Sequence, residues 1–187
     1  MRTRLLATCA ALLFACGKTH ETNPTSAVNT GARPNIVFIT LDTTRVDAIG
    51  PEAVGIETPS YNALARRGMR FRQAYCTVPQ TLPSHTSMLT GLYPGGHGVH
   101  ENARNVPPDR PLLAEQLHNA GYRTAAFVSA FALARRFGLS RGFDVYDDET
   151  KPGLAERTAG ETTDRVLAWL GPQTQPLFLW EIGRAHV

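Results

Sequence analysis

The sequence of 187 residues has few cysteines, little net charge and no hydrophobic run long enough to cross a membrane as a helix. Three cysteines, one of them in a leader-like segment, do not make a disulfide framework. A formal net charge of only +3 argues against a nucleic-acid-binding surface. With 42% hydrophobic and 19% charged residues, the composition is that of a globular protein with one core of ordinary size.

The N-terminal segment has the pattern of an export signal followed by a tether. Residues 1–15 combine Arg2 and Arg4 with a short apolar run, which predicts a signal peptide. Leu13-Phe14-Ala15-Cys16 resembles a bacterial lipobox, in which the cysteine becomes the lipidated first residue. Residues 16–33 would then be a polar tether that holds the protein on the periplasmic side of a bacterial membrane. The alternative is an ordinary signal peptide with an incidental Cys16.

From Pro34 onward, β-branched and aromatic runs alternate with helical patterns. Strands buried on both faces of a sheet are expected at residues 36–39, 124–128 and 177–180. Helices are expected at residues 58–68, 112–121 and 158–170, the last with Val166, Leu167 and Leu170 facing inward. This order predicts an α/β fold, with a mainly parallel sheet flanked by helices on both faces. Residues 69–75 are expected to form a further strand, residues 135–139 a surface turn, and residues 142–148 a solvated acidic loop.

Residues 81–91, with the sequence TLPSHTSMLTG, have the pattern of a short helix that begins beside a hydroxyl group. Pro83 suits the first turn, because its missing N–H would be unbonded there, and Gly91 suits a left-handed end. Thr81 therefore lies at a helix N-terminus. Free backbone N–H groups and the helix dipole favour a sulfate or phosphate group at that point.

Two motifs resemble those of a known family. The run TLPSHTSMLTGLYPGGHGV is similar to the sulfatase signature, with Thr81 at the place of the Cys or Ser nucleophile and His85 at the place of an Arg. The run PNIVFITLDTTRVDAIG resembles the first metal-binding strand of the sulfatase and alkaline phosphatase superfamily. Residues 34–180 would then be the N-terminal part of a sulfatase-like domain.

The resemblance implies a site at the carboxyl end of the first strand. Asp42 would be a metal ligand, and Thr81 both a second ligand and the nucleophile, around a divalent cation that is Ca²⁺ in preference to Mn²⁺ or Mg²⁺. Ser84 and Asn102 would bind the substrate, although an Asx-turn is an equal alternative for Asn102. His85 would bond the nucleophile or carry a proton, unless it lies on the helix surface.

Several positions depart from the family pattern. Thr43 stands where sulfatases often have a second Asp, and Ser129 and Phe131 stand where many have a Lys and a His that hold the sulfate. Cys76 has the wrong spacing to be the cysteine that becomes formylglycine, and we interpret it as a small buried hydrophobe. His97 is expected in a loop, solvated or bonded to the backbone.

A threonine hydroxyl cannot become formylglycine and needs a divalent metal to act as a nucleophile at neutral pH. Three functions remain open: a hydrolase of small sulfate or phosphate esters, a periplasmic phosphoalcohol transferase with a covalent Thr81 intermediate, and a non-catalytic anion-binding lipoprotein. Residues 181–187 look like translated sequencing adapter and are expected to be non-native. The chain as written is then expected to be an inactive fragment, since further metal ligands would lie beyond residue 180.

Overall fold

The computed structural model describes residues 33–151, 153–172 and 174–184. The expected signal peptide, tether and lipidation site at Cys16 lie outside this part of the chain, as do residues 185–187. None of the helices within the described ranges has the length and apolar character that a membrane span requires.

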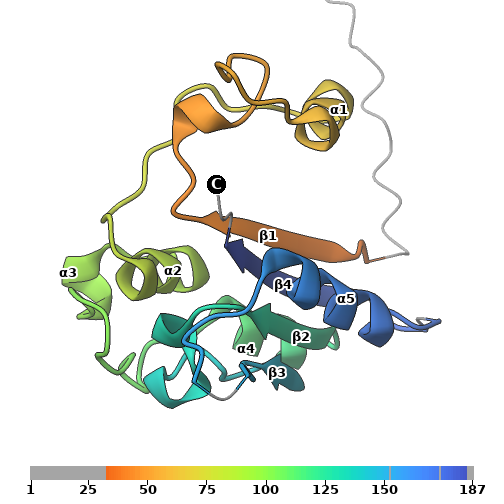
Figure 1. Cartoon of the computed structure of the whole chain (residues 1–187). Helices are drawn as coiled ribbons and strands as arrows, with labels where there is room; N and C mark the ends of the chain where they lie inside the picture. Colours follow the sequence, from red (N-terminus) through yellow and green to blue (C-terminus); the bar gives the residue numbers. More distant parts are fainter. Residues whose placement is uncertain (1–32, 152, 173, 185–187) are drawn as a thin grey trace, which may run out of the picture. The chain divides into compact units, whose positions relative to one another are not determined.

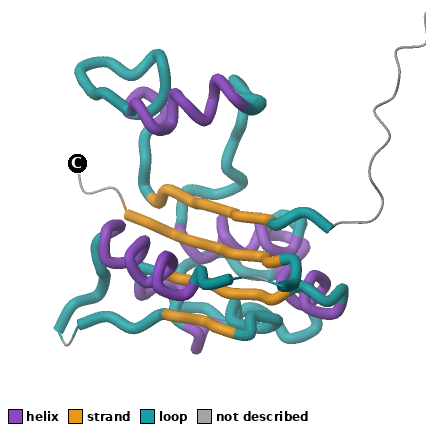
Figure 2. The backbone as a smooth tube through the Cα atoms, turned by 90° about the vertical axis from the view of Figure 1, so that its right-hand side faces the viewer, coloured by secondary structure: helices purple, strands orange, loops and turns teal. Residues whose placement is uncertain are grey.

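A four-stranded parallel sheet with the order β1-β4-β2-β3 forms the centre of the fold (Figure 1). Its strands are β1 (Ile36–Asp42), β2 (Arg123–Val128), β3 (Val145–Asp147) and β4 (Leu177–Arg184). All neighbouring pairs run parallel, and Figure 2 shows the strands side by side. Because parallel neighbours need crossover connections, helical segments link the strands. The expected α/β class with a mainly parallel sheet is confirmed.

The helices are α1 (Pro59–Arg67), α2 (Thr81–Thr90), α3 (Pro94–His97), α4 (Leu113–Asn119) and α5 (Ala159–Trp169). Three short 3-10 helices are η1 (Val46–Ala48), η2 (Phe131–Leu133) and η3 (Arg135–Phe137). The predicted end of α2 agrees with the structure, because Gly91 follows its last residue in the left-handed conformation, with φ 71°. The inward orientation expected for three residues near the end of α5 holds for Val166, which is buried, but not for Leu167 and Leu170, which are 63% and 37% exposed.

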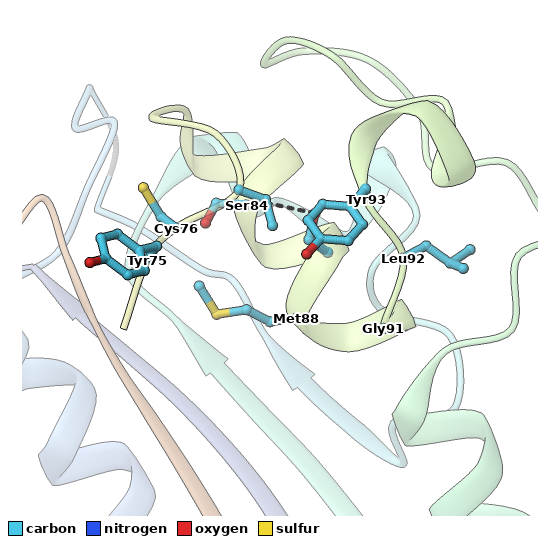
Figure 3. A pocket seen from close by; sticks show the side chains of 9 residues that line it. Tyr75, Cys76, Ser84, Met88, Gly91, Leu92 and Tyr93 are labelled. Carbon is cyan, nitrogen blue, oxygen red and sulfur yellow. Dashed lines mark hydrogen bonds between the residues drawn. The ribbon is translucent and has the colours of Figure 1, made fainter. Parts of the chain in front are cut away.

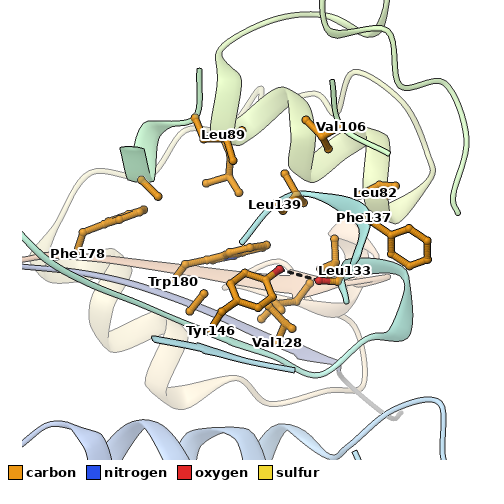
Figure 4. Packing of buried hydrophobic residues seen from close by; sticks show 14 of the residues in the cluster. Leu82, Leu89, Val106, Val128, Leu133, Phe137, Leu139, Tyr146, Phe178 and Trp180 are labelled. Atoms are coloured by element: carbon orange, nitrogen blue, oxygen red, sulfur yellow. Dashed lines mark hydrogen bonds between the residues drawn. The ribbon is translucent and has the colours of Figure 1, made fainter. Parts of the chain in front are cut away.

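The central strand β4 is buried on both faces and divides the core in two. Phe178 and Trp180 point to the larger cluster, where they meet Leu82 and Leu89 of α2 and the aromatic ring of Tyr146 (Figure 4). Alternate β4 residues point to the smaller cluster, whose helical member is Val166 of α5. Successive side chains of a strand point to opposite faces, so helices cover both sides of the sheet.

Strand β1 lies at an edge of the sheet and is covered on one face only. Val37, Ile39 and Leu41 are between 46% and 53% exposed, whereas Ile36 and Phe38 pack against the larger cluster. The prediction of a strand buried on both faces is therefore wrong for β1. The prediction does hold for residues 177–180, because β4 lies inside the sheet, pairs with both β1 and β2, and continues to Arg184.

Two other segments differ from expectation. Residues 69–75 form a loop, because they find no strand to pair with, and Phe71 and Tyr75 are at least 75% exposed. Residues 145–147 form the edge strand β3 and not a solvated loop. Tyr146 is buried there and donates its hydroxyl to the carbonyl of Leu133 at 2.7 Å, a bond drawn in Figure 4.

Gly142 offers a test of this packing. Its φ is +79°, and an added Cβ would lie 2.2 Å from the backbone nitrogen of Glu115 in α4. We expect Gly142→Ala to lower the free energy of unfolding by about 3–5 kcal/mol, from left-handed strain together with a backbone clash. Gly153→Ala is the matched control, since Gly153 has φ +82° and no atom within 4 Å of the added Cβ. It should cost only about 1–2 kcal/mol, and equal losses in urea unfolding would contradict this packing.

Candidate active site

Asp42 and Thr81 face one another at the carboxyl edge of the sheet. Asp42 is the last residue of β1, and Thr81 is the first residue of α2. The Thr81 hydroxyl points at both carboxylate oxygens of Asp42, with Oγ1 3.4 Å from each. Strong O–H···O bonds are about 2.5–3.0 Å long, so this contact is loose and shared. The two residues line a cavity of about 330 Å³, and the sequence prediction that brings them together agrees with this geometry.

The backbone N–H groups at the start of α2 are mostly occupied. Leu82 N–H donates to Asn102 Oδ1 at 2.9 Å, and Ser84 N–H donates to the carbonyl of Gln80 at 3.0 Å. Pro83 has no N–H to offer. Fewer backbone N–H groups are therefore free to bind a sulfate or phosphate group than the sequence predicted. Within the described residues, the Thr81 N–H is the first-turn donor that stays without an acceptor.

Asn102 caps the N-terminus of α2 from a distant loop. The side-chain oxygen of Asn102 accepts from Leu82 N–H. It therefore neither forms the Asx-turn that the sequence allowed nor stays free to bind a substrate. Gln80, at the position just before the helix, makes no side-chain cap bond of its own. The cap therefore fixes the first turn of α2 without using residues next to Thr81 in the sequence.

Left-handed backbone marks both sides of the site. Two described residues other than glycine have positive φ: Thr43 at 56° and Ala103 at 61°. They directly follow Asp42 and Asn102. A β-branched residue rarely adopts this conformation, and such strain gathers at functional sites. The turns that present Asp42 and Asn102 are therefore held by their surroundings and not by local preference.

His85 is buried beneath Thr81 and is only 3% exposed, which rules out the helix-surface alternative. Its Nδ1 lies 2.7 Å from the carbonyl oxygen of Thr81, and its Nε2 lies 3.2 Å from Oγ1 of Thr40. A carbonyl can only accept, so Nδ1 carries the proton and Nε2 accepts from Thr40. Burial lowers the pKa of His85, and the ring is neutral at pH 7. The structure thus places His85 on the backbone of Thr81 and not on its hydroxyl.

Thr40 is a site residue that the sequence prediction missed. Its hydroxyl accepts from Trp180 Nε1 at 3.2 Å and meets His85 on the other side, which ties β1, β4 and α2 together. The sequence could have indicated this role. Side chains two residues apart on a strand share a face, and Thr40 lies two residues before Asp42.

Ser84 and Cys76 lie between two cavities. Both line the cavity of Asp42 and Thr81, and both line a neighbouring cavity of about 290 Å³ that Tyr75 and Tyr93 border (Figure 3). Cys76 is exposed, so its interpretation as a buried hydrophobe is wrong. The loop around it carries no strand that would bury it. Ser84 stays a candidate for substrate contact.

The remaining candidates lie apart from this cavity. His97 ends the short helix α3, where the sequence predicted a loop, and it is fully buried. Its Nδ1 accepts from Val99 N–H at 3.1 Å, which agrees with the backbone-bonded alternative. Ser129 is buried, and its hydroxyl has no partner among the described residues, while Phe131 is half-exposed. Neither lines the cavity of Thr81.

The oxygen donors at the site fit a hard cation in kind, because such ions take oxygen ligands. In number the donors supply only part of a shell. Within the described part of the chain, no three His, Cys, Asp or Glu side chains gather into a metal site.

The role of Asn102 can be tested by substitution. We expect Asn102→Ala to lower the free energy of unfolding by about 1–2 kcal/mol, because the Leu82 N–H loses its acceptor. Asn102→Asp keeps a carbonyl-like oxygen in the same place and should stay closer to the unsubstituted protein. Urea unfolding measures both variants. An Asn102→Ala variant as stable as the unsubstituted chain would show that the cap is not needed.

Comparison with known proteins identifies the family of the chain. The sulfatase family model matches residues 34–182. The chain is 35% identical to an ulvan-active sulfatase of Formosa agariphila over 94 residues, which are 50% of this chain and 18% of that protein. It is 29% identical to another sulfatase of Formosa agariphila over 186 residues, 97% of this chain and 33% of that one. A choline-sulfatase of Rhizobium meliloti is 34% identical over 98 residues, 51% of this chain and 19% of that protein. The chain thus spans about a fifth to a third of these relatives' length.

Solved structures share the fold. One is a protein in complex with its substrate D-glucosamine-2-N,6-O-disulfate, with a TM-score of 0.68 at 23% identity over 82% of this chain and 34% of that one. Another is the phosphonate monoester hydrolase of Agrobacterium radiobacter, with a TM-score of 0.66 at 21% identity over 81% of this chain and 41% of that one. The family match extends over most of the chain and contains both Asp42 and Thr81. The protein belongs to the sulfatase family.

Proposed function

We propose that this chain carries the nucleophile end of a metal-dependent hydrolase of small sulfate esters, with phosphate or phosphonate esters as a second substrate class. The observation that carries the proposal is the Thr81 hydroxyl, which points at both Asp42 oxygens inside a cavity. The names of the sulfatase relatives support the first substrate class, and the phosphonate monoester hydrolase supports the second.

The proposed reaction has two displacements at sulfur. In the first, Thr81 Oγ1 forms a bond to sulfur while the ester S–O bond breaks, and the hydroxyl proton passes by way of Asp42 to the leaving alcohol. In the second, water attacks the sulfur of the Thr81 sulfate ester. One water proton returns to Thr81 Oγ1, and sulfate leaves as the other proton goes to solvent. The same steps apply to phosphorus.

The surrounding residues hold the nucleophile still for this chemistry. His85 fixes the carbonyl of Thr81, and Asn102 fixes the next N–H along the chain. Neither bond involves the Thr81 hydroxyl, which stays available to attack. Asp42 orients that hydroxyl through its loose contact, so that a lone pair of Oγ1 can face the cavity.

A divalent cation, Ca²⁺ in preference to Mn²⁺ or Mg²⁺, would be held by Asp42 and Thr81 through their oxygen atoms. When bound, it would favour ionisation of the hydroxyl and neutralise charge on the transferring group. Its further ligands would come from outside the described residues. A chain extended to the length of the relatives is therefore the proper material for an activity test.

In such an extended chain we expect Thr81→Ala to reduce kcat on an aryl sulfate or a phosphodiester by about 10³-fold or more, because the variant lacks the hydroxyl that is proposed to attack. Thr81→Ser keeps a hydroxyl and should retain measurable turnover. Both variants should unfold like the unsubstituted protein, since the loose bond to Asp42 is the one hydrogen bond that the Thr81 side chain makes within the described residues. Steady-state kinetics with and without a chelator gives the readout.

The outcomes separate the candidate functions. A Thr81→Ala variant that keeps most of its activity would reduce Thr81 to a helix-starting residue. Product that forms only when an alcohol acceptor is added would identify a phosphoalcohol transferase, which uses the same Thr81 intermediate. Anion binding without turnover of either ester would identify the non-catalytic lipoprotein.

A further inference from the structure

Thr77, Ser87 and His97 form a hydrogen-bonded chain that the proposed chemistry does not use. Thr77 Oγ1 donates to Ser87 Oγ at 3.0 Å, a bond drawn as a dashed line in Figure 3. Ser87 Oγ lies 3.0 Å from Nε2 of His97. The three residues come from the loop before α2, from α2 and from the end of α3. These hydrogen bonds therefore link the loop that precedes Thr81 with α2, the helix that Thr81 begins.

The backbone settles which nitrogen of His97 carries the proton. Val99 N–H donates to Nδ1, so in the neutral ring the proton is on Nε2, which donates to Ser87 Oγ. Burial, together with the nearby His100, lowers the pKa of His97 and keeps the ring neutral at pH 7. Nε2 cannot then act as a base toward Ser87. The pair is an anchor and not a second nucleophile with its base.

This anchor holds a segment that has little else to hold it. All residues from 71 to 79 are exposed except the half-buried Val78. Among the described residues, the Thr77–Ser87 bond is the one hydrogen bond that segment 71–79 makes. Gln80 and Thr81 follow directly. The Thr77–Ser87 bond is therefore one of the contacts that hold the start of α2, beside the Asn102 cap and the His85 bond to the Thr81 carbonyl.

We propose that His97, acting through Ser87, positions Thr77 and thereby holds the start of α2 with the Thr81 hydroxyl opposite Asp42. His97 suits this role because it is fully buried and bonded at both ring nitrogens. The importance of this anchor for catalysis rests on the proposed function, in which Thr81 is the reacting hydroxyl. The experiment below measures only how firmly the start of α2 is held. Its result and the result of the activity test on Thr81 are therefore independent.

The test is amide hydrogen exchange in the full 187-residue chain, read at Leu82 and Ser84. Their N–H groups bond to Asn102 Oδ1 and to the carbonyl of Gln80, so they report on the first turn of α2. We expect Thr77→Val to raise both exchange rates about fivefold, as the loss of one typical hydrogen bond would. Ser87→Ala should do the same, and the double variant should add little more, because both changes break one chain.

Two variants serve as controls. Thr77→Ser keeps the hydroxyl and should restore slow exchange at Leu82. Thr150→Val removes a similar exposed hydroxyl, which donates to the carbonyl of Leu154 in a distant loop, and should leave Leu82 unchanged. The proposal is overturned if Thr77→Val leaves Leu82 and Ser84 at their original rates. It is also overturned if Thr150→Val speeds them equally.

Discussion

The site depends on the burial of one neutral imidazole, that of His85. The ring lies 5.7 Å from the ring of Trp180 and is bonded to the Thr81 carbonyl on one side and the Thr40 hydroxyl on the other. The Thr81 carbonyl can only accept, which puts the proton of the neutral ring on Nδ1 and leaves Nε2 to accept from the Thr40 hydroxyl. Through it the start of α2 is fixed to β1 and β4, the two strands that bring Asp42 to the same edge.

The supports around Thr81 share one property: they hold its backbone and leave its hydroxyl free. His85 bonds the carbonyl, Asn102 bonds the next N–H, and Thr77 is tied to the middle of the same helix. Among the described residues, Asp42 is the one hydrogen-bond partner of the hydroxyl, at a distance too long for a strong bond. A nucleophile needs this combination, because a well-placed oxygen that is already strongly bonded would have to give up that bond in order to attack.

Sequence patterns predicted the parts of this arrangement that are local. The hydrophobic run of β1, the Pro and Gly that bound α2, and the placement of Asp42 after a parallel strand follow from residue spacing. The burial of His85 and His97 did not follow, since a histidine in a polar stretch carries no sign of what will cover it. The exposed face of β1 and the pairing of β3 were missed for a similar reason. Both depend on which strands become neighbours, and that is decided across the whole sheet.

The central claim is that the Thr81 hydroxyl takes up the transferring group while Asp42 faces it. Rapid acid quenching of an extended chain during turnover of an aryl sulfate, followed by mass spectrometry of its peptides, tests this most directly. The account predicts a sulfo group on the peptide that contains Thr81, absent in Thr81→Ala and depleted when the substrate is exhausted. Turnover with no modified peptide, or with the group on Ser84 or Ser87, would contradict it.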